Sequence, residues 1–270
     1  MYPYISIFGK NISSYAVLAI AGVIAAAIYA AVLSYKKKIN GDDAMYYLTF
    51  AFGFLMIGAM ALYQLVNVRN TVSLLPYLFK DFKYFINNWT VGFVFYGGMY
   101  GVLVGGIVYS AFFKQDIRKM FMLLTPVFVL FHAFGRVGCF LSGCCYGMES
   151  EAYGIVYHDA ISGANGVPYL PVQLYEAAGN LVIFAVILIF GYRKEDCYFR
   201  PLGIYLVLYG IMRFVLEFFR GDEIRGALGV FSTSQWISLV TVPLGIYMLL
   251  CPTEKNLLGK AYNQVVISKQ

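Results

Sequence analysis

The sequence predicts an all-α membrane protein with seven transmembrane helices, on the grounds of its composition and the length of its apolar runs. Of the 270 residues, 60% are hydrophobic and 13% are charged, and the mean hydropathy is +0.70. Soluble domains carry about 25% charged residues, so an ordinary soluble protein is excluded. A helix needs about 20 mostly apolar residues to cross a bilayer. We predict that residues 1–270 form a single integral-membrane domain with spans over residues 14–35, 44–65, 91–113, 120–141, 172–191, 201–219 and 235–251.

The first predicted span differs from a cleavable signal peptide. Only Lys10 supplies a positive charge before it. Its apolar run from Tyr15 to Leu33 also exceeds the roughly 7–15 residues of a signal-peptide core. We expect this span to remain in the protein.

The distribution of basic residues between the spans predicts the topology. Twelve of the 20 lysines and arginines fall on one side of the seven-span arrangement: Lys36, Lys37, Lys38, Lys114, Arg118, Lys119, Arg193, Lys194, Arg200, Lys255, Lys260 and Lys269. Because cytoplasmic loops are enriched in Lys and Arg, we expect an outside N-terminus and a cytoplasmic C-terminus. The net charge of +6 follows mostly from this bias, so it indicates no nucleic-acid partner.

Two segments outside the spans are predicted to be structured. Residues 66–90 mix apolar and charged positions, which favours an external amphipathic helix lying at the membrane interface. Residues 148–171, rich in glycine and proline, form an external loop long enough to fold over a site. Loops of this length are usually functional or disordered.

Glycines at four-residue spacing line one face of the third span. Gly97, Gly101 and Gly105 form a small-xxx-small pattern that lets another helix or a lipid chain approach closely. Tight helix packing explains the pattern by itself. A lipid chain is the alternative, so Gly97 and the adjacent Gly98 are also candidate substrate-binding positions.

Arg136 lies near one end of the fourth span, in GRVGCFLSGCCYG (residues 135–147). A buried guanidinium is costly unless it is paired or hydrated, and intramembrane ionisable residues are therefore functional candidates. Gly135 and Gly138 leave room for an anion beside it. A structural ion pair or a side chain that reaches toward the interface is the alternative.

A second polar cluster lies in the sixth span and just after it. Tyr209, Arg213, Glu217 and Arg220 are spaced by four, four and three residues, which places them on one face of a helix. Two arginines and one glutamate leave one surplus positive charge on this face. A guanidinium group binds two phosphate oxygens at once. With Arg136, this face predicts a site for the phosphate of a lipid headgroup, with Glu217 orienting the arginines. A self-neutralising Arg213–Glu217 pair is the alternative.

Three cysteines, Cys139, Cys144 and Cys145, are crowded into the same motif as Arg136. Small apolar packing residues are the default interpretation of buried cysteine. A redox pair, a nucleophile and a metal site are alternatives. No set of four ligands is evident for zinc, so no metal is predicted.

Four motifs in series resemble the prolipoprotein diacylglyceryl transferase family. They are FYGGMYG (95–101), GRVGCFLSGCCYG (135–147), PVQLYE (171–176) and YGIMRFVLEFFR (209–220), and the opening MYPYISIFGKNISSYAV is also similar to the start of that family. The similarity runs in order through nearly the whole chain. It is more specific than any one motif.

The resemblance implies a seven-span enzyme of the bacterial plasma membrane. Such enzymes transfer the diacylglyceryl group of phosphatidylglycerol to the lipobox cysteine of a preprolipoprotein signal peptide and release glycerol phosphate, without a cofactor or metal. The motifs carry substrate-binding or catalytic roles over to matching positions of this chain: Arg136, Tyr209, Arg213, Glu217, Arg220, Gln173, Tyr175 and Glu176.

This chain departs from the family at the position expected to accept the thiol proton. Tyr96 replaces the histidine before the glycine pair, and a tyrosine with a pKa of about 10 is a poor base. Cys139, Ser142 and Cys144 also replace polar residues of the family's GNFxNGE signature. His132, four residues before Arg136 on the same helix face, is a candidate replacement base beside Tyr96.

These departures leave two alternatives to the family reaction. The chain retains phosphatidylglycerol chemistry but uses another acceptor, or it is a non-catalytic lipid-binding membrane protein. Arginine substitutions separate these functions, because an enzyme loses turnover whereas a binder loses lipid retention.

Overall fold

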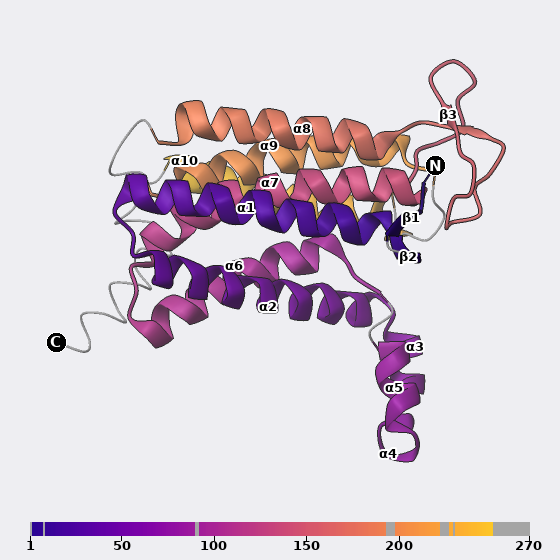
Figure 1. Ribbon diagram of the computed structural model, residues 1–270, viewed down its shortest axis with the longest axis horizontal. Coiled ribbons are helices and arrows are strands. Elements are labelled where there is room, and N and C mark those ends of the chain that lie inside the picture. Colours follow the sequence, from indigo (N-terminus) through magenta and orange to yellow (C-terminus); the bar gives the residue numbers. More distant parts are fainter. Residues whose placement is uncertain are drawn as a thin grey trace. The chain divides into compact units, whose positions relative to one another are not determined.

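A computed structural model describes residues 2–7, 9–89, 92–192, 198–221, 227–228 and 230–250 (Figure 1). Its helical segments are α1 (Ser14–Lys37), α2 (Gly41–Val66), α3 (Val68–Leu74), α4 (Tyr77–Lys80), α5 (Phe82–Trp89), α6 (Phe95–Phe113), α7 (Ile117–Ser142), α8 (Val172–Val186), the π-helical η1 (Ile187–Gly191), α9 (Arg200–Leu216), the 3-10 helix η2 (Glu217–Phe219) and α10 (Thr233–Leu250). Three short antiparallel pairs complete it: β1 (Tyr4–Ile7) with β2 (Lys10–Ser13), β3 (Ile155–Val156) with β4 (Pro168–Tyr169), and β5 (Ala227–Leu228) with β6 (Phe231–Ser232).

The predicted fold class is confirmed. Seven of the described helical segments are long and apolar enough to cross a membrane: Ser14–Lys37, Gly41–Val66, Phe95–Phe113, Ile117–Ser142, Val172–Gly191, Arg200–Phe219 and Thr233–Leu250. Each corresponds to one predicted span. The chain is therefore a multi-pass membrane protein.

Two predicted boundaries differ from the structure for identifiable reasons. The third span begins at Phe95, because Val94 is extended and its N–H donates to the Ala59 carbonyl of α2. The single amphipathic helix predicted over residues 66–90 is instead three short helices, α3, α4 and α5. Pro76 lies between α3 and α4, where it cannot donate a helical hydrogen bond. Asp81 precedes α5 and accepts from the Tyr84 N–H, as a capping residue does.

The chain divides into two compact units. Of the described residues, those up to 38 and those from 121 onward form the first, and residues 39–120 form the second. The described helices of the first unit are α1, α8, α9, α10 and nearly all of α7, while α2 to α6 belong to the second. That these units act as one integral-membrane domain stays a prediction.

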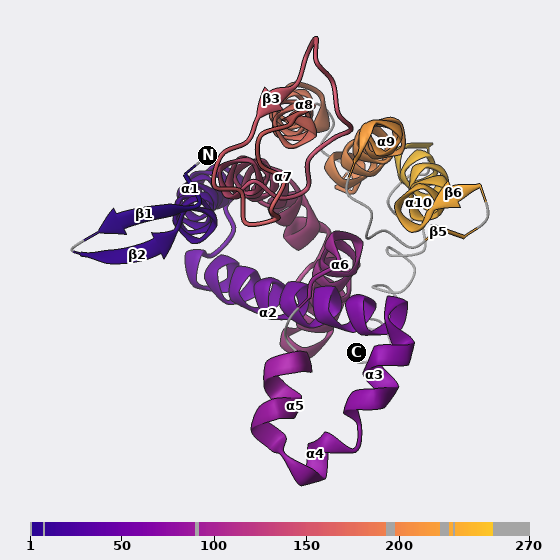
Figure 2. The ribbon, with the colours of Figure 1, turned by 90° about the vertical axis from the view of Figure 1, so that its right-hand side faces the viewer.

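Helix α7 is the packing centre of the first unit, with α1, α8 and α9 around it (Figure 2). A Cβ atom at Gly22 of α1 would lie 2.8 Å from the Phe134 Cβ of α7, so the two helices approach closely there. On another side, the Phe128 ring of α7 meets the Tyr205 ring of α9 edge to face, at 5.8 Å between centroids. This packing holds one face of α7 against the helices that carry the polar cluster.

The second unit is built on the crossing of α2 and α6 (Figure 1). Cβ atoms at Gly97 and Gly101 would collide with the backbone carbonyl oxygens of Gly58 and Phe54, respectively. The glycine stripe of α6 therefore faces α2, as small residues do where helix backbones meet. Helix packing accounts for Gly97 and Gly101.

We expect Gly101→Leu to destabilise this helix crossing. Its side chain has no space between the backbones of α6 and α2, and overpacking of this kind costs about 1–3 kcal/mol or more. The thermal unfolding midpoint in detergent should fall. Gly53→Leu on α2 is the matched control, because nothing lies within 4 Å of a Cβ at Gly53. An equal midpoint for both variants would contradict this account of the crossing.

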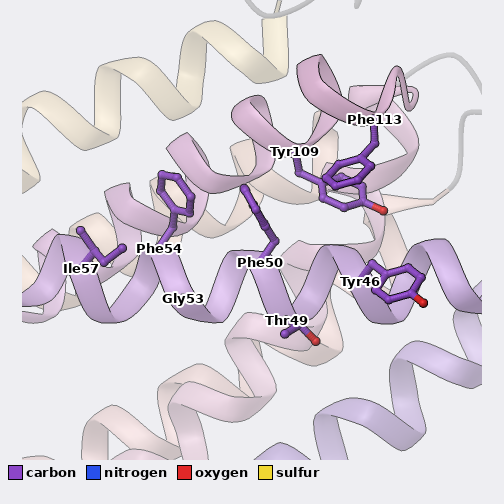
Figure 3. A pocket seen from close by; sticks show the side chains of 8 residues that line it. All are labelled: Tyr46, Thr49, Phe50, Gly53, Phe54, Ile57, Tyr109 and Phe113. Carbon is purple, nitrogen blue, oxygen red and sulfur yellow. The ribbon is translucent and has the colours of Figure 1, made fainter.

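A pocket of about 540 Å³ opens beside this crossing (Figure 3). It is lined by Tyr46, Thr49, Phe50, Gly53, Phe54, Ile57, Tyr109 and Phe113. The rings of Phe50 and Tyr109 lie 5.8 Å apart on its wall. The described lining is mostly aromatic and aliphatic and contains no lysine or arginine. The pocket therefore suits a hydrocarbon chain rather than a phosphate group.

Candidate active site

A buried carboxylate, Glu176 on α8, is the centre of the polar cluster in the first unit. Its Oε1 lies 3.0 Å from Nη2 of Arg136 and accepts a hydrogen bond from the Tyr209 hydroxyl, also at 3.0 Å. Its Oε2 lies 3.4 Å from Nη1 of Arg213. Residues from α7, α8 and α9 thus meet at one carboxylate with no solvent exposure.

Arg136 and His132 reach this centre from successive turns of α7. Nε of Arg136 donates to Nε2 of His132 at 3.3 Å, and the same nitrogen of His132 lies 3.6 Å from Glu176. Because Nε2 accepts this bond, His132 is neutral with its proton on Nδ1. The same-face relation predicted for these two residues is confirmed.

Arg213 joins the two carboxylates of the cluster. Its Nη2 lies 2.8 Å from Glu217, at the start of η2, and also donates to the Ser234 hydroxyl at 3.4 Å. The Arg213–Glu217 pair, which the spacing offered as an alternative, is therefore present, and that Glu217 orients the arginines stays a prediction. Glu176, unlike Glu217, contacts both Arg136 and Arg213 among the ion pairs described.

Arg220 does not continue the helix face, contrary to the prediction. Helix α9 ends at Leu216, η2 covers the next three residues, and the Arg220 backbone is extended. Arg220 instead forms an antiparallel bridge with Gly147. It still lies within electrostatic range of Glu176, so the bridge to Gly147 rather than helical spacing holds it near the cluster.

The arginines and glutamates of the cluster carry a surplus of one positive charge between them. Arg136, Arg213 and Arg220 supply three positive charges, Glu176 and Glu217 supply two negative charges, and His132 is neutral. Buried ions are tolerated when they are paired and hydrogen-bonded. An arrangement with one excess guanidinium charge suits a single anionic group.

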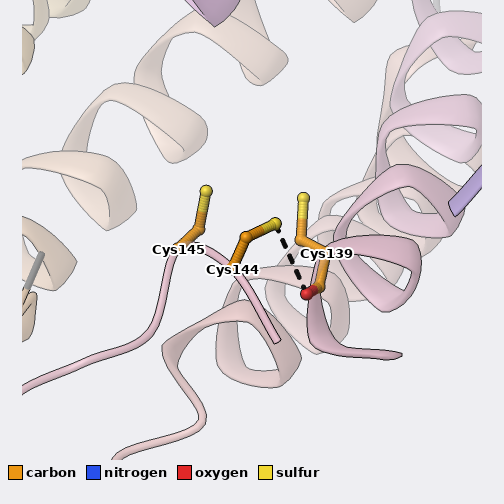
Figure 4. A group of neighbouring side chains, drawn as sticks. All are labelled: Cys139, Cys144 and Cys145. Atoms are coloured by element: carbon orange, nitrogen blue, oxygen red, sulfur yellow. Dashed lines mark hydrogen bonds between the residues drawn. The ribbon is translucent and has the colours of Figure 1, made fainter. Parts of the chain in front are cut away.

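The three cysteines converge because α7 ends in a Schellman turn. Gly143 has a φ of 68°, the Cys144 N–H donates to the Cys139 carbonyl at 3.1 Å, and the Gly143 N–H donates to Phe140. This is the bonding expected where a glycine ends a helix. The turn folds the chain back, so that Cys144 and Cys145 lie beside Cys139 (Figure 4).

The environment of Cys145 lowers the pKa of its thiol. The pKa of the Cys145 thiol lies well below its usual range. The largest cause is hydrogen bonding with the thiols of Cys139 and Cys144, and the positive charges of Arg220 and Arg136 lower the pKa further. The Cys144 thiol donates to the Cys139 carbonyl at 3.6 Å.

Gln173 fixes the turn to α8 and to the loop of residues 148–171. Its side-chain N–H donates to the Cys144 carbonyl at 2.7 Å and contacts the Tyr157 hydroxyl at 3.4 Å. From the same loop, Ser162 donates to the Gly143 carbonyl at 2.5 Å and the Ile161 N–H donates to Ser142 at 3.0 Å. The predicted loop thus folds over the end of α7.

The remaining predicted residues lie elsewhere. Tyr175 is 46% exposed, although its neighbour Glu176 is buried. Tyr96, Gly97 and Gly98 are buried on α6 of the second unit, where Gly97 and Gly98 face α2. Substrate-binding or proton-transfer roles for these four residues stay predictions.

Sequence reasoning missed two residues that support the cluster. Asn180 is fully buried four residues after Glu176, and its side chain donates to the Glu176 carbonyl at 2.8 Å. Its helical spacing from Glu176 was a signal that could have identified it. Ser234, which accepts from Arg213, comes from α10 and had no such signal.

Comparisons with known proteins agree on one family. The sequence profile described as prolipoprotein diacylglyceryl transferase matches residues 3–251. The phosphatidylglycerol–prolipoprotein diacylglyceryl transferase of Clostridium tetani is 31% identical over 243 residues, which cover 90% of this chain and 94% of the relative. Phosphatidylglycerol–prolipoprotein diacylglyceryl transferase 2 of Clostridium perfringens is 30% identical, over 90% of this chain and 91% of the relative. The transferase of Idiomarina loihiensis is 33% identical over 64% of this chain and 67% of its own length.

Proposed function

The chain belongs to the prolipoprotein diacylglyceryl transferase family, and on that premise we propose that it transfers the diacylglyceryl group of phosphatidylglycerol to the thiol of a prolipoprotein. The acceptor is the lipobox cysteine of the signal peptide, and glycerol phosphate is released. The observation that carries this proposal is the buried Arg136–Glu176–Arg213 cluster, which supplies guanidinium groups for a phosphate.

The chemistry is a displacement at a glycerol carbon. The thiolate sulfur forms a bond to that carbon, the carbon–oxygen bond to phosphate breaks, and glycerol phosphate leaves with the bonding electrons. The thiol proton passes to a base. Charge develops on the departing phosphate, where preorganised donors such as Arg136, Arg213 and Arg220 stabilise the transition state.

His132 is the residue that we propose as the base. It lies within the cluster, and its Nε2 lone pair is occupied by Arg136. Movement of Arg136 toward a substrate phosphate would free this lone pair for the thiol proton. Binding of the phosphate and activation of the thiol are thereby coupled through one hydrogen bond.

We expect His132→Gln to lower transfer more than Tyr96→Phe. General-base catalysis contributes about 10²–10⁴-fold, and glutamine retains an acceptor for Arg136 but cannot take a proton. The measurement is kcat for each purified variant across a pH series. Loss of activity in Tyr96→Phe alone would assign the proton to Tyr96 and overturn the histidine proposal.

The bacterial plasma membrane is the proposed location, with the N-terminus outside and the C-terminus cytoplasmic. Bacterial relatives support the membrane, and the lysines at the end of α1, Lys36, Lys37 and Lys38, support this orientation. A fluorescent protein fused to the C-terminus should fluoresce, whereas an alkaline phosphatase fused there should be inactive. The reverse pair of results would reject this topology.

The reaction itself is tested with purified protein in detergent micelles, phosphatidylglycerol and a lipobox peptide. We expect the peptide to gain the mass of one diacylglyceryl group and glycerol phosphate to appear in equal amount. A peptide with serine in place of the lipobox cysteine is the matched control and should gain nothing. Glycerol phosphate release without a modified peptide would indicate another acceptor, and absence of both products from folded protein would reject the transferase proposal.

A further inference from the structure

Three sulfur atoms lie close together beside the polar cluster. The Sγ atoms of Cys139, Cys144 and Cys145 all lie within 4.8 Å of one another, and each cysteine is half-buried. Figure 4 shows the three side chains next to each other, with the sulfur of Cys144 directed toward Cys139. The transferase chemistry proposed above uses none of these thiols.

The backbone holds this arrangement in place. Cys145 has a φ of 61°, in the left-handed region that non-glycine residues rarely adopt. The Gln173 side chain anchors the Cys144 carbonyl at 2.7 Å, and a Cβ at Gly143 would meet the Ala160 side chain at 2.5 Å. A non-glycine residue held in this conformation marks a position worth testing for function.

We propose that Cys139, Cys144 and Cys145 form a trithiolate binding site for one soft monovalent cation, Cu(I). Metal–sulfur bonds of about 2.3 Å place the sulfurs of a trigonal site about 4.0 Å apart. The observed limit of 4.8 Å therefore requires only small side-chain rotations. This proposal does not rest on the proposed transferase activity.

The ligand set selects the ion. Thiolates favour soft cations such as Cu(I) and Zn(II), and zinc sites are almost always four-coordinate. Among the residues that the structure describes, the group of potential ligands contains three cysteines and no histidine or carboxylate. Three sulfur ligands suit Cu(I), which is stable in trigonal thiolate coordination.

Charge and proton balance are compatible with binding. Each thiol that becomes a ligand releases its proton to solvent, and copper stays in the Cu(I) state, so no oxidant or reductant is consumed. Three thiolates and one Cu(I) carry a net charge of −2. Arg136 and Arg220 lie within electrostatic range of Cys145 and offset this charge.

The test is a competition between the purified full-length protein and a chromophoric Cu(I) chelator, under anaerobic reducing conditions. The double variant Cys197→Ser/Cys251→Ser is the matched control, because it removes two cysteines and keeps the proposed site. We expect the wild type and this control to retain one Cu(I) per chain. Cys145→Ser and Cys139→Ser should lose the ion at the same chelator concentration.

A second measurement uses the unmodified protein, so that it does not depend on the folding of the variants. Cu(I) should protect Cys139, Cys144 and Cys145 from alkylation by a maleimide, as counted by peptide mass spectrometry, while Cys197 and Cys251 gain no protection. Failure of the wild type to retain Cu(I), or equal retention after Cys145→Ser, would overturn the proposal. Retention of Zn(II) but not Cu(I), measured in parallel, would also overturn it.

Discussion

Arg136→Ala should reduce diacylglyceryl transfer by about 10²–10³-fold in kcat, the loss measured when one preorganised donor to a developing negative charge is removed. The Arg136 guanidinium contacts Glu176 at 3.0 Å and belongs to the surplus positive charge of the cluster. Its removal leaves the departing phosphate with fewer donors. The measurement is turnover of the purified variant with phosphatidylglycerol and a lipobox peptide.

Two further variants make the result specific. Arg136→Lys retains the charge but lacks the planar fork that binds two phosphate oxygens, so we expect it to recover little activity. Arg118→Ala is the matched control on the same helix, because Arg118 pairs with Asp116 near the start of α7 and belongs to no predicted site. Wild-type turnover by Arg136→Ala would remove the arginine from the mechanism.

Glu176→Gln should be the most destabilising conservative substitution in the cluster. Glutamine preserves the shape of the side chain but removes the charge that faces Arg136, Arg213 and the Tyr209 hydroxyl. Removing one partner of a buried ion pair costs about 3–5 kcal/mol, because it leaves the other charge uncompensated. The free energy of unfolding in detergent measures this cost.

The control for that measurement is Glu149→Gln, which removes a carboxylate from an exposed position bonded to Tyr169 at 3.4 Å. Its effect should be within about 0.5 kcal/mol of zero, as for most surface substitutions. If Glu176→Gln were also neutral, Glu176 would be protonated in the native protein and the ion-pair account of the cluster would fail.

The seven spans were predictable because each is a long apolar run, a feature that needs no knowledge of tertiary contacts. The start of α6 was not predictable, because it depends on a hydrogen bond to another helix, from the Val94 N–H to the Ala59 carbonyl, that holds the extended Val94. The break at Pro76 was predictable from the sequence, because a proline has no N–H for a helical hydrogen bond. The prediction of one amphipathic helix overlooked this.

The polar cluster was only partly predictable, because some of its contacts join residues from different helices. Helical spacing correctly placed His132 beside Arg136 and Arg213 beside Glu217. It did not identify Glu176 as the shared partner, because that role depends on how three helices meet. Arg220 was placed on the wrong element, since its helix ends before it and a bridge to Gly147 positions it instead.

On the proposed function, the buried carboxylate of Glu176 sets a limit on how tightly the site holds a phosphate. Its oxygens already contact the guanidinium groups of Arg136 and Arg213. The free energy of phosphate binding is therefore only the difference between an arginine–phosphate pair and the arginine–glutamate pair that it replaces. The same competition acts on the product, because Glu176 takes back the guanidinium groups as glycerol phosphate departs. A resident counter-ion thus lowers affinity for substrate and product together, which favours rapid exchange over retention.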